Sequence, residues 1–461
     1  MIPAHAAGAK SLRPRCQFDH KETRLSDPVQ SKNYRRNFIC LACDFGLFGL
    51  AMAFIGSNTV IPGYLTALGA SAAVVGVVTS LQNASWLLPQ LFAARTLADK
   101  PRKKPHILRP AASGRLLFLV LGLVLWLTRA RPAWLMLILS TIAIIGFWIG
   151  DGMASVPWFD LLSKIIPARR RGRLTSVGQV LSGVLGFAAG FAVEWLLSDK
   201  GPSFPDNYVS LLLLGFTFLA LSFVATSLIV EPTGAPVERN PSWSEYLPQL
   251  WLVLKNDHAF RRFVFARQLF GLSGLATPFY MTYALTQLGL PAQVAGRYTS
   301  ISVLGSILAA VWMGWLNERS GSKRVILLSI GLATAVPVLA LIIPWILPAS
   351  GAALAWGYGL VFFAMSATMS SMMPGWMNFV LEHAPEMDRP KYVGLTNTLN
   401  GVTTLFSTLG GLILAWTHDN YVFLFCLTLA GLSLAWPLAL RLQDPRHAPS
   451  EHSTIVQEPL L

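Results

Sequence analysis

The sequence predicts an all-α integral membrane protein of about twelve transmembrane helices, arranged as two pseudo-symmetric six-helix bundles. Hydrophobic residues make up 53% of the 461 residues and charged residues only 13%, against about 25% charged residues in an ordinary soluble domain. Apolar stretches close to the roughly 20 residues that cross a bilayer recur from end to end. The two halves of the chain also resemble each other, which predicts a duplicated six-helix unit.

Twelve spans are expected where apolar runs lie between polar boundaries. In the first half they are residues 38–65, 72–94, 107–127, 134–166, 174–197 and 209–230. In the second half they are 263–285, 294–316, 325–347, 352–381, 393–416 and 422–440. The expected domains are an N-terminal tail (1–36), a bundle (37–230), a Pro-rich linker (231–258), a second bundle (259–442) and a C-terminal tail (443–461).

Orientation follows from the basic residues, because Lys and Arg are retained on the cytoplasmic side during insertion. Of the 36 Lys and Arg, 31 fall in the two tails, the linker and the other even-numbered loops, with Arg109 and Arg115 counted in the second loop. The odd-numbered loops hold only Arg129, Arg131 and Lys200. Both termini are therefore expected to be cytoplasmic.

The net charge of +14 does not predict a nucleic-acid partner, because no stripes of aromatic and basic residues are present to stack bases. The four cysteines, at positions 16, 40, 43 and 426, show no disulfide or metal-ligand spacing. Cys40 and Cys43 are expected to pack as small apolar side chains. No cofactor, metal or catalytic motif is expected, and an enzyme is not predicted.

The internal repeat is visible at two nearly equal offsets. A shift of 220 residues carries one set of positions onto identical residues, namely Leu68, Gly69, Gly76, Thr79 and Ser80 onto Leu288, Gly289, Gly296, Thr299 and Ser300. A shift of 218 carries Trp158, Pro167, Arg171, Leu181 and Gly183 onto Trp376, Pro385, Arg389, Leu399 and Gly401. Matches over spans two to five and eight to eleven favour a duplicated bundle.

The loops after spans two and eight carry a more specific pattern. Asp99-Lys-Pro-Arg-Lys-Lys104 follows span two, and Gly314-Trp-Leu-Asn-Glu-Arg-Ser-Gly-Ser-Lys-Arg324 follows span eight. Both resemble the signature loop of the major facilitator superfamily, although no Gly precedes Asp99, Pro101 replaces a polar-Gly step and Glu318 replaces Asp. The chain resembles a bacterial member of this family. The resemblance implies two parallel six-helix halves that move against each other.

In the resembled family this loop controls the switch between outward-facing and inward-facing states. The resemblance therefore implies a conformational latch made of Asp99, Arg102, Glu318 and Lys323. An acidic residue at such a turn can face the positive N-terminal end of a helix and pair with nearby Arg. The alternative for Arg102, Lys103 and Lys104 is charge that only fixes the topology.

Ionisable groups inside spans are costly and are candidates for function. Asp44, Asp151 and Arg267 are such groups, in spans one, four and seven. The helices that carry them line the central cavity in the resembled fold, so the three are expected on one aqueous path, with the carboxylates as a proton relay. The alternative is a structural Asp–Arg pair that ties the halves together.

Other charged residues near the span ends have simpler expected roles. Glu194 and Arg297 lie near the outer ends of spans five and eight, where each is expected to reach the membrane interface. Asp160 and Lys164, four residues apart, are expected to form a surface pair.

Uncharged polar and aromatic residues complete the expected substrate pathway, since amides and indoles bind polar organic solutes. The alternative role is hydrogen bonding between neighbouring helices. Besides Trp158, these residues are Asn58, Asn83, Trp148, Gln179, Gln268, Tyr280, Trp376, Asn378, Asn397 and Asn400. Glycines at positions 183, 186, 190, 401, 410 and 411 are expected to permit close helix crossings.

The resemblance implies an alternating-access transporter in the cytoplasmic (inner) membrane, with a small organic solute as its partner. Proton coupling and the direction of movement stay open, and a monomer is expected. Span five lacks the Gly-Pro pair of the family's drug/proton antiporters, which favours sugar or metabolite movement over multidrug efflux. The alternative is a non-transporting protein of the same fold that serves assembly, lipid or pigment handling, or sensing.

Overall fold

The computed structural model describes residues 33–97, 100, 102–232, 252–347, 351–385 and 389–445, and within these ranges the regular structure is helical. Residues 1–32, most of the linker and residues 446–461 lie outside the described residues, as do Asp99 and the other short gaps. The expected structure of both tails therefore stays a prediction.

The first half of the chain forms seven helices. They are α1 (Tyr34–Ile55), α2 (Val60–Ala67), α3 (Ala72–Leu97), α4 (Lys104–Thr128), α5 (Ala133–Ile165), α6 (Ala168–Leu196) and α7 (Asp206–Ser227). The second half contains α9 (His258–Gly271), η2 (Leu272–Leu275), α10 (Phe279–Thr286), α11 (Val294–Ser320), α12 (Ser322–Ile346) and α13 (Ala352–Ser370). It continues with η3 (Met372–Met377), α14 (Asn378–His383), α15 (Arg389–Thr403), α16 (Phe406–Trp416), α17 (Tyr421–Ser433) and α18 (Ala435–Leu440).

Ten helices of the described chain are long and apolar enough to cross a membrane. The two other expected spans, residues 72–94 and 263–285, coincide with α3 and with the interrupted helix α9–η2–α10. The structure thus confirms an all-α membrane protein and supports the number of twelve spans only approximately.

The repeat that was read from the sequence is present in the backbone. Gly69 and Gly289, which the 220-residue shift relates, both adopt positive φ, +86° and +62°, directly after α2 and α10. Glycine is favoured in this left-handed region because it has no Cβ. Each glycine therefore ends the outer part of the first span of its half in the same way.

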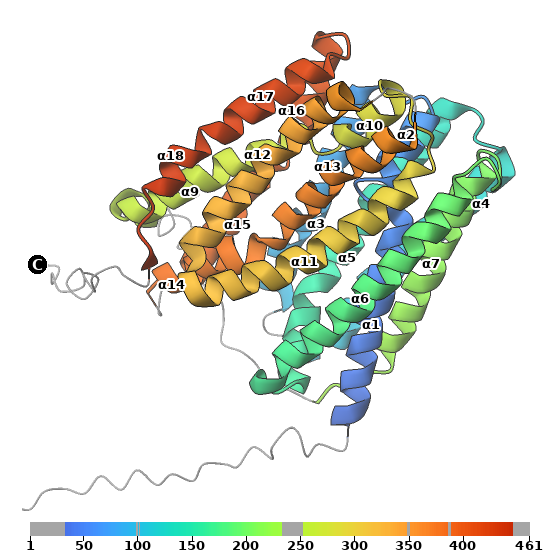
Figure 1. Ribbon diagram of the computed structural model, residues 1–461. Coiled ribbons are helices and arrows are strands. Elements are labelled where there is room, and N and C mark those ends of the chain that lie inside the picture. Colours follow the sequence, from blue (N-terminus) through green and yellow to red (C-terminus); the bar gives the residue numbers. More distant parts are fainter. Residues whose placement is uncertain are drawn as a thin grey trace, which may run out of the picture.

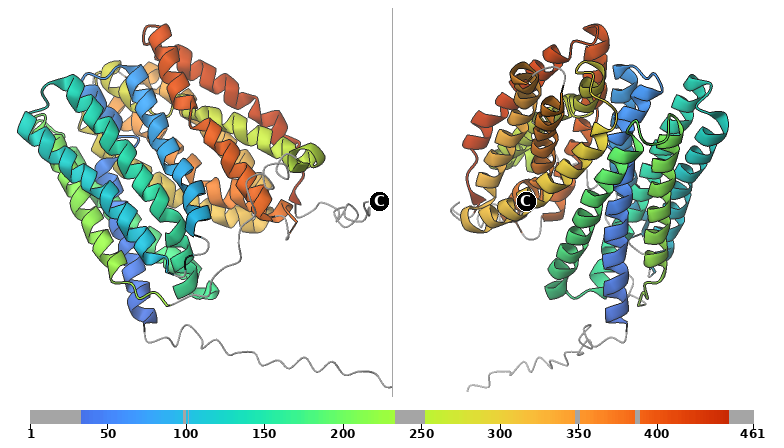
Figure 2. Two further views of the ribbon diagram at one scale, coloured as in Figure 1. Left: turned by 180° about the vertical axis from the view of Figure 1, so that it is seen from behind. Right: turned by 45° about the vertical axis from the view of Figure 1, so that its right-hand side comes forward.

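The hydrophobic core is shared at one end of the molecule and split at the other. One cluster joins both halves through the outer ends of their helices, including Tyr64 and Tyr280. Separate clusters fill the inner ends, one in the first half around Leu161 and two in the second half, around Phe263 and around Met313. The two inner ends therefore pack independently, and the ribbons diverge towards that end (Figures 1 and 2).

Contacts between the halves obey the same pseudo-symmetry. The main helix pairs are α6 with α11 and α3 with α16, supported by α2 with α10. The Ser80 hydroxyl accepts a hydrogen bond from the Thr408 backbone N–H at 2.7 Å, and the related Ser300 hydroxyl donates to the Phe187 carbonyl at 2.9 Å. These bonds hold the outer parts of the bundles together.

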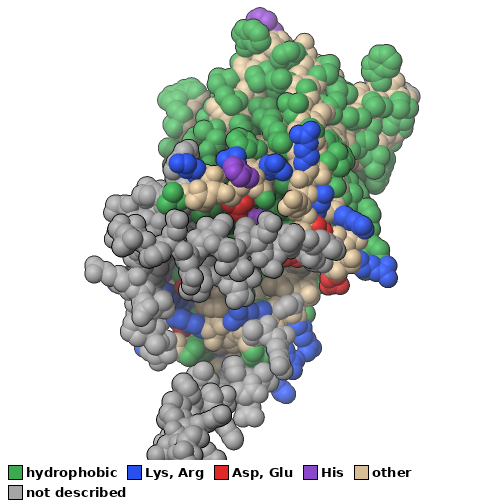
Figure 3. All heavy atoms as spheres, turned by 90° about the vertical axis from the view of Figure 1, so that its left-hand side faces the viewer, with side chains coloured by type: hydrophobic (Ala, Val, Ile, Leu, Met, Phe, Trp, Pro, Cys, Tyr) green, Lys and Arg blue, Asp and Glu red, His purple; other side chains and the backbone are tan. Residues whose placement is uncertain are grey.

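Charged side chains are also distributed unevenly between the two ends of the molecule. Figure 3 shows one face on which hydrophobic side chains cover one end and Lys and Arg gather towards the other. Lys and Arg follow the even-numbered spans in the sequence, for example at Arg102, Arg319 and Arg324. The positive-inside rule therefore predicts that the end where the two cores separate is the cytoplasmic end.

Candidate functional site

Asp44 lies on α1 in the interior of the first half. Its side chain is 6% exposed and accepts hydrogen bonds from the Trp158 indole N–H at 2.9 Å and from the Ser222 hydroxyl. These partners come from α5 and α7. Asp44 therefore lies where three helices of one bundle meet, and it is fully engaged by hydrogen-bond donors.

Arg115 supplies the positive charge near this carboxylate. It lies on α4, is 9% exposed, and donates to the Leu219 carbonyl at 2.8 Å. Its guanidinium interacts electrostatically with Asp44 and Asp151. The assignment of Arg115 to the second cytoplasmic loop was wrong, because α4 begins at Lys104 and buries this residue three turns into the helix.

Asp151 completes the cluster from the middle of α5. One of its oxygens accepts a hydrogen bond from the Trp86 indole N–H on α3 at 3.2 Å. Arg115 influences both carboxylates electrostatically without a direct ion pair to either of them among the described residues, and the group of Asp44, Arg115 and Asp151 carries one excess negative charge when all three are ionised. We call these three residues the acid cluster.

Arg267 lies in the second half, on α9. Its Nη2 donates to the Met372 thioether at 3.3 Å, and its guanidinium lies over the rings of Phe270 at 5.3 Å and Trp376 at 5.1 Å. Asp44 and Asp151 both lie within electrostatic range of Arg115, whereas Arg267 lies among aromatic residues of its own half. The Asp–Arg tie between the halves has no support in these contacts.

A pair of tryptophans relates the two charged sites. Trp158 and Trp376 correspond under the 218-residue shift. The first donates to Asp44, whereas the second stacks on Arg267 and donates to the Ser329 hydroxyl at 3.1 Å. Equivalent tryptophans therefore contact a carboxylate in the first half and a guanidinium in the second half.

The remaining polar candidates are distributed over both halves. Asn83, Gln179 and Asn397 are exposed, Asn58, Gln268 and Asn378 are half-buried, and Tyr280 is buried against the Phe425 ring at 4.8 Å. Trp148 and Asn400 each bury one polar atom, Nε1 and Oδ1, that has no hydrogen-bond partner within the described ranges. Their role in a substrate pathway stays a prediction.

At the outer end, Glu194 on α6 and Arg297 on α11 form an ion pair between the halves. The Arg297 guanidinium also lies over the Trp356 ring at 4.4 Å. The two were expected to reach the membrane interface separately. Their positions near the outer ends of spans five and eight were the available signal, because these spans cross in this structure.

At the cytoplasmic end, the latch residues are only partly described. Arg102 and Glu318 are exposed and Lys323 is half-buried, while Asp99 lies outside the described residues. The surface pair expected between Asp160 and Lys164 is wrong. Instead, Asp160 pairs with Lys103 at 3.3 Å and Lys164 with Glu231 at 3.5 Å.

Glu231 ties the chain after α7 to the start of α4. Its carboxylate accepts hydrogen bonds from the backbone N–H groups of Lys103 and Lys104, at 2.7 and 2.8 Å. An anion at a helix N-terminus satisfies donors that have no partner within the helix. The basic loop before α4 is thus fixed within the first half.

The glycine predictions are confirmed for the helix crossings. A Cβ on Gly190 or Gly296 would collide with the facing helix, α11 or α6, and one on Gly410 or Gly411 would collide with η2 or α3. Gly183 lies equally close to Ile307 on α11. Gly186 has only ordinary contacts and Gly401 has open space, so the expectation was wrong for Gly401.

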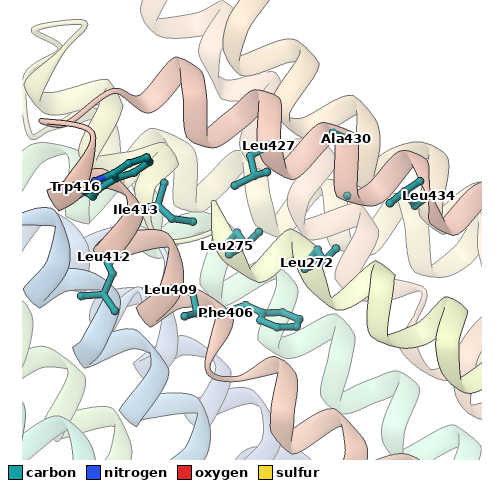
Figure 4. Close-up of a pocket in the computed structure, with 11 residues that line it drawn as sticks. Leu272, Leu275, Phe406, Leu409, Leu412, Ile413, Trp416, Leu427, Ala430 and Leu434 are labelled. Atoms are coloured by element: carbon teal, nitrogen blue, oxygen red, sulfur yellow. The ribbon is translucent and has the colours of Figure 1, made fainter.

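One cavity lies away from the charged residues. It has a volume of about 740 Å³ and is lined by apolar side chains of η2, α16 and α17, among them Leu275, Phe406 and Leu427. Figure 4 shows these side chains around the groove. Leu412 and Trp416, which line it, are 51% and 77% exposed, so the groove is open at the surface, and its mainly apolar lining does not suit a hydrophilic solute.

A second, much smaller cavity of about 20 Å³ has polar walls. Ser273, Thr277 and Tyr280 contribute to it from η2 and α10, and Thr368 faces them from α13. Such a space holds about one water molecule. Within the described residues, no group of three or more His, Cys, Asp or Glu side chains is placed to hold a metal ion.

Relatives and solved structures agree with this architecture. The chain is 24% identical over 379 residues to the uncharacterized protein Rv2209 of Mycobacterium tuberculosis, covering 76% of this chain and 70% of the relative. It is 22% identical over 441 residues to the multidrug resistance protein MdtG of Escherichia fergusonii, covering 91% and 98%. A bacterial homologue of the iron transporter ferroportin in an inward-facing state superimposes with a TM-score of 0.64 at 16% identity, covering 88% and 98%.

The family follows from a direct sequence match. A profile of the Major Facilitator Superfamily matches residues 203–407 and 263–458, which together make up more than half of the chain. With the duplicated helices, the shared outer core and the related structures, this match shows that the chain belongs to the major facilitator superfamily.

Proposed function

We propose that the protein is a secondary transporter that moves a small organic solute by alternating access between its two halves. The observation that carries the proposal is the division of the core, which is common to both halves at the outer end and separate at the cytoplasmic end. Two bundles that pack in this way can rock about their contact and open the other side. The arrangement corresponds to an inward-facing state.

The proposed architecture is two six-helix bundles, residues 37–230 and 259–442, joined by the linker 231–258. Both termini lie in the cytoplasm, the membrane is the cytoplasmic (inner) membrane, and the protein acts as a monomer. The distribution of Lys and Arg supports the orientation.

The acid cluster is the proposed site of proton coupling. Asp44, Arg115 and Asp151 carry one excess negative charge inside a membrane bundle, where an uncompensated charge is costly. A proton taken up by either carboxylate removes this excess. Three helices of one half contribute to the cluster, so a change in its charge can change how these helices pack.

The residues near the expected pathway favour one chemical class of solute, whereas the names of the relatives do not identify the solute of this chain. The MdtG proteins are named for multidrug resistance, while span five of this chain lacks the Gly-Pro pair of drug/proton antiporters. Amide and indole groups near the expected pathway suit a polar or amphipathic organic molecule.

Transport in proteoliposomes tests the proposal. The reconstituted wild-type chain should accumulate a labelled solute under an imposed pH gradient, and Asp151→Asn should abolish accumulation while it leaves equilibration down a solute gradient in place. Asp199→Asn, which removes an exposed carboxylate after α6, is the matched control and should transport normally. Failure of the wild-type chain to move any solute of a broad panel would reject a transporter, and accumulation indifferent to pH would reject the coupling site.

A further inference from the structure

Arg267 is a cation inside the second half that no described carboxylate neutralises. Among the ion pairs of the described residues none includes it. A guanidinium has five N–H donors, and the acceptor that Arg267 reaches, the Met372 sulfur at 3.3 Å, is a weak one. Most of its hydrogen-bonding capacity is therefore open to a ligand.

Arg115 provides the comparison within the same molecule. It donates to a backbone carbonyl at 2.8 Å and has two carboxylates in electrostatic range. Both arginines lie inside helical bundles, but only Arg115 has the partners that offset the cost of removing a charge from water. An arginine with only a structural role is expected to have partners of the kind that Arg115 has. Arg267 lacks such partners among the described residues, which favours a binding role.

The aromatic contacts of Arg267 orient it for an anion. The rings of Phe270 and Trp376 lie 5.3 and 5.1 Å from the guanidinium carbon. Aromatic rings accept no strong hydrogen bond from a guanidinium, so its planar fork of N–H donors, which matches the geometry of a carboxylate or phosphate, is left for another partner. Trp376 is itself fixed by its hydrogen bond to Ser329.

Arg267 lies in the inner part of the second half and keeps part of its surface accessible. Helix α9 packs on α15, α17 and α18, and η3 packs on α11 to α14, all from the same half. These are the inner parts of the second half, where the two cores are separate. Arg267 lies against Trp376, and Asp44 accepts a hydrogen bond from the equivalent Trp158. The charged site of the first half therefore carries an excess negative charge, and the charged site of the second half carries an excess positive charge.

We propose that Arg267 binds an oxyanion group of the transported solute, a carboxylate, phosphate or sulfonate, and that the substrate class is therefore an organic anion. This inference rests on the proposed transport function and adds the substrate class to it. Uptake of the anion would neutralise Arg267 while a proton neutralises the acid cluster, so both halves would lose their excess charge in the loaded state.

Thermal stability of the purified full-length chain in lipid-free detergent tests the inference. The probes are benzoate, phenyl phosphate and benzenesulfonate, compared with the neutral benzamide at equal ionic strength. At least one anion should raise the Tm in proportion to the logarithm of its concentration, and benzamide should not. The shift should be reduced in Arg267→Lys, which keeps the charge without the planar fork, and lost in Arg267→Leu.

A second readout needs no ligand. Arg267→Leu should raise the Tm of the ligand-free protein by about 2–4 °C, because it removes a charge that has no counter-charge. The matched variant Arg115→Leu should lower the Tm, since it strands two carboxylates. A structural role for Arg267 predicts a lower Tm in both variants.

Three outcomes would overturn the inference. They are stabilisation by benzamide as strong as by the anions, no stabilisation by any of the three anions, and stabilisation only by added phosphatidylglycerol, which would make Arg267 a lipid site. None of these outcomes affects solute movement in proteoliposomes, so the substrate class can fail while the transport function holds.

Discussion

At the residue scale, Asp257 shows how one carboxylate holds the cytoplasmic end of the second half together. It caps α9 by accepting a hydrogen bond from the Phe260 N–H at 2.8 Å. It also accepts from His383 Nε2 at 2.8 Å and from the Tyr392 hydroxyl at 2.9 Å. Burial raises the pKa of Asp257, but these hydrogen bonds outweigh it and lower the pKa to about 2.

Asp257→Asn should therefore destabilise the protein at neutral pH, by about 1–3 kcal/mol for the lost charged hydrogen bonds. Because the folded pKa lies below the ordinary value, the carboxylate stabilises the fold above about pH 4. This contribution is lost as the pH falls towards 2. The difference in Tm between the wild type and Asp257→Asn, measured from pH 7 to pH 3, should shrink as the pH falls below about 4, and part of it should remain at pH 3.

The matched control is Asp419→Asn, which changes an exposed carboxylate in the turn before α17. Its Tm should follow that of the wild type at every pH. An Asp257→Asn protein whose deficit persists unchanged at pH 3 would show that the hydrogen bonds do not depend on the ionised carboxylate.

The charged residues also show what the sequence can predict at this scale. Asp44 and Asp151 could be identified because a carboxylate inside an apolar run is rare. Arg115 was missed since basic residues near a span boundary were assigned to the loop, although it lies eight residues inside the expected span 107–127. The pairing of Glu194 with Arg297 depends on a crossing between helices that are distant in the sequence, and such a crossing cannot be predicted from the individual residues.

At the element scale, the helical character and the order of the apolar segments were predictable and their number was approximately so, but their interruptions were not. Gly56 separates α1 from α2 with φ at +51°, and a Cβ there would press against Val60. Likewise η2 and the π-helical η3 break expected spans seven and ten. Hydropathy averages over about 20 residues, so it registers a span and does not register a local change in helix type.

The crossing of α6 and α11 depends on glycine at the contact. Gly296→Ala should destabilise the inward-facing structure by about 1–3 kcal/mol, because the new methyl group meets the α6 backbone at Glu194 and Gly190. Gly76→Ala should do the same at the pseudo-symmetric crossing of α3 with α16, where a Cβ meets the Ser407 carbonyl. Thermal denaturation in detergent measures both effects.

Gly314→Ala is the control on the same helix, α11. A Cβ at Gly314 has nothing within 4 Å, so the substitution should leave the Tm unchanged or raise it through the better helix propensity of alanine. Equal losses for Gly296→Ala and Gly314→Ala would indicate that close approach at the crossing is not what the glycine provides.

At the scale of the whole molecule, contacts between the halves gather at the outer end. They include the ion pair Glu194–Arg297, the hydrogen bond between Thr59 and Thr299 at 2.9 Å, and the related pair of serine contacts. In the proposed transport cycle, opening to the outside would separate all of them. Their free energy is therefore part of the difference between the inward-facing and outward-facing states.

Glu194→Gln should shift the population towards the outward-facing state, because it removes the charge that holds Arg297 across the outer contact. The effect is measured in a cysteine-free background with spin labels at Ser198, after α6, and Gln293, before α11. The distribution of distances between the labels should gain a longer component. The control is Asp206→Asn, which breaks the ion pair with Arg129 between α4 and α7 within one half and should leave the distribution unchanged. A distribution that is identical in Glu194→Gln and wild type would mean that the outer ion pair does not bias the two states, and that the glycine crossings alone keep the outer side closed.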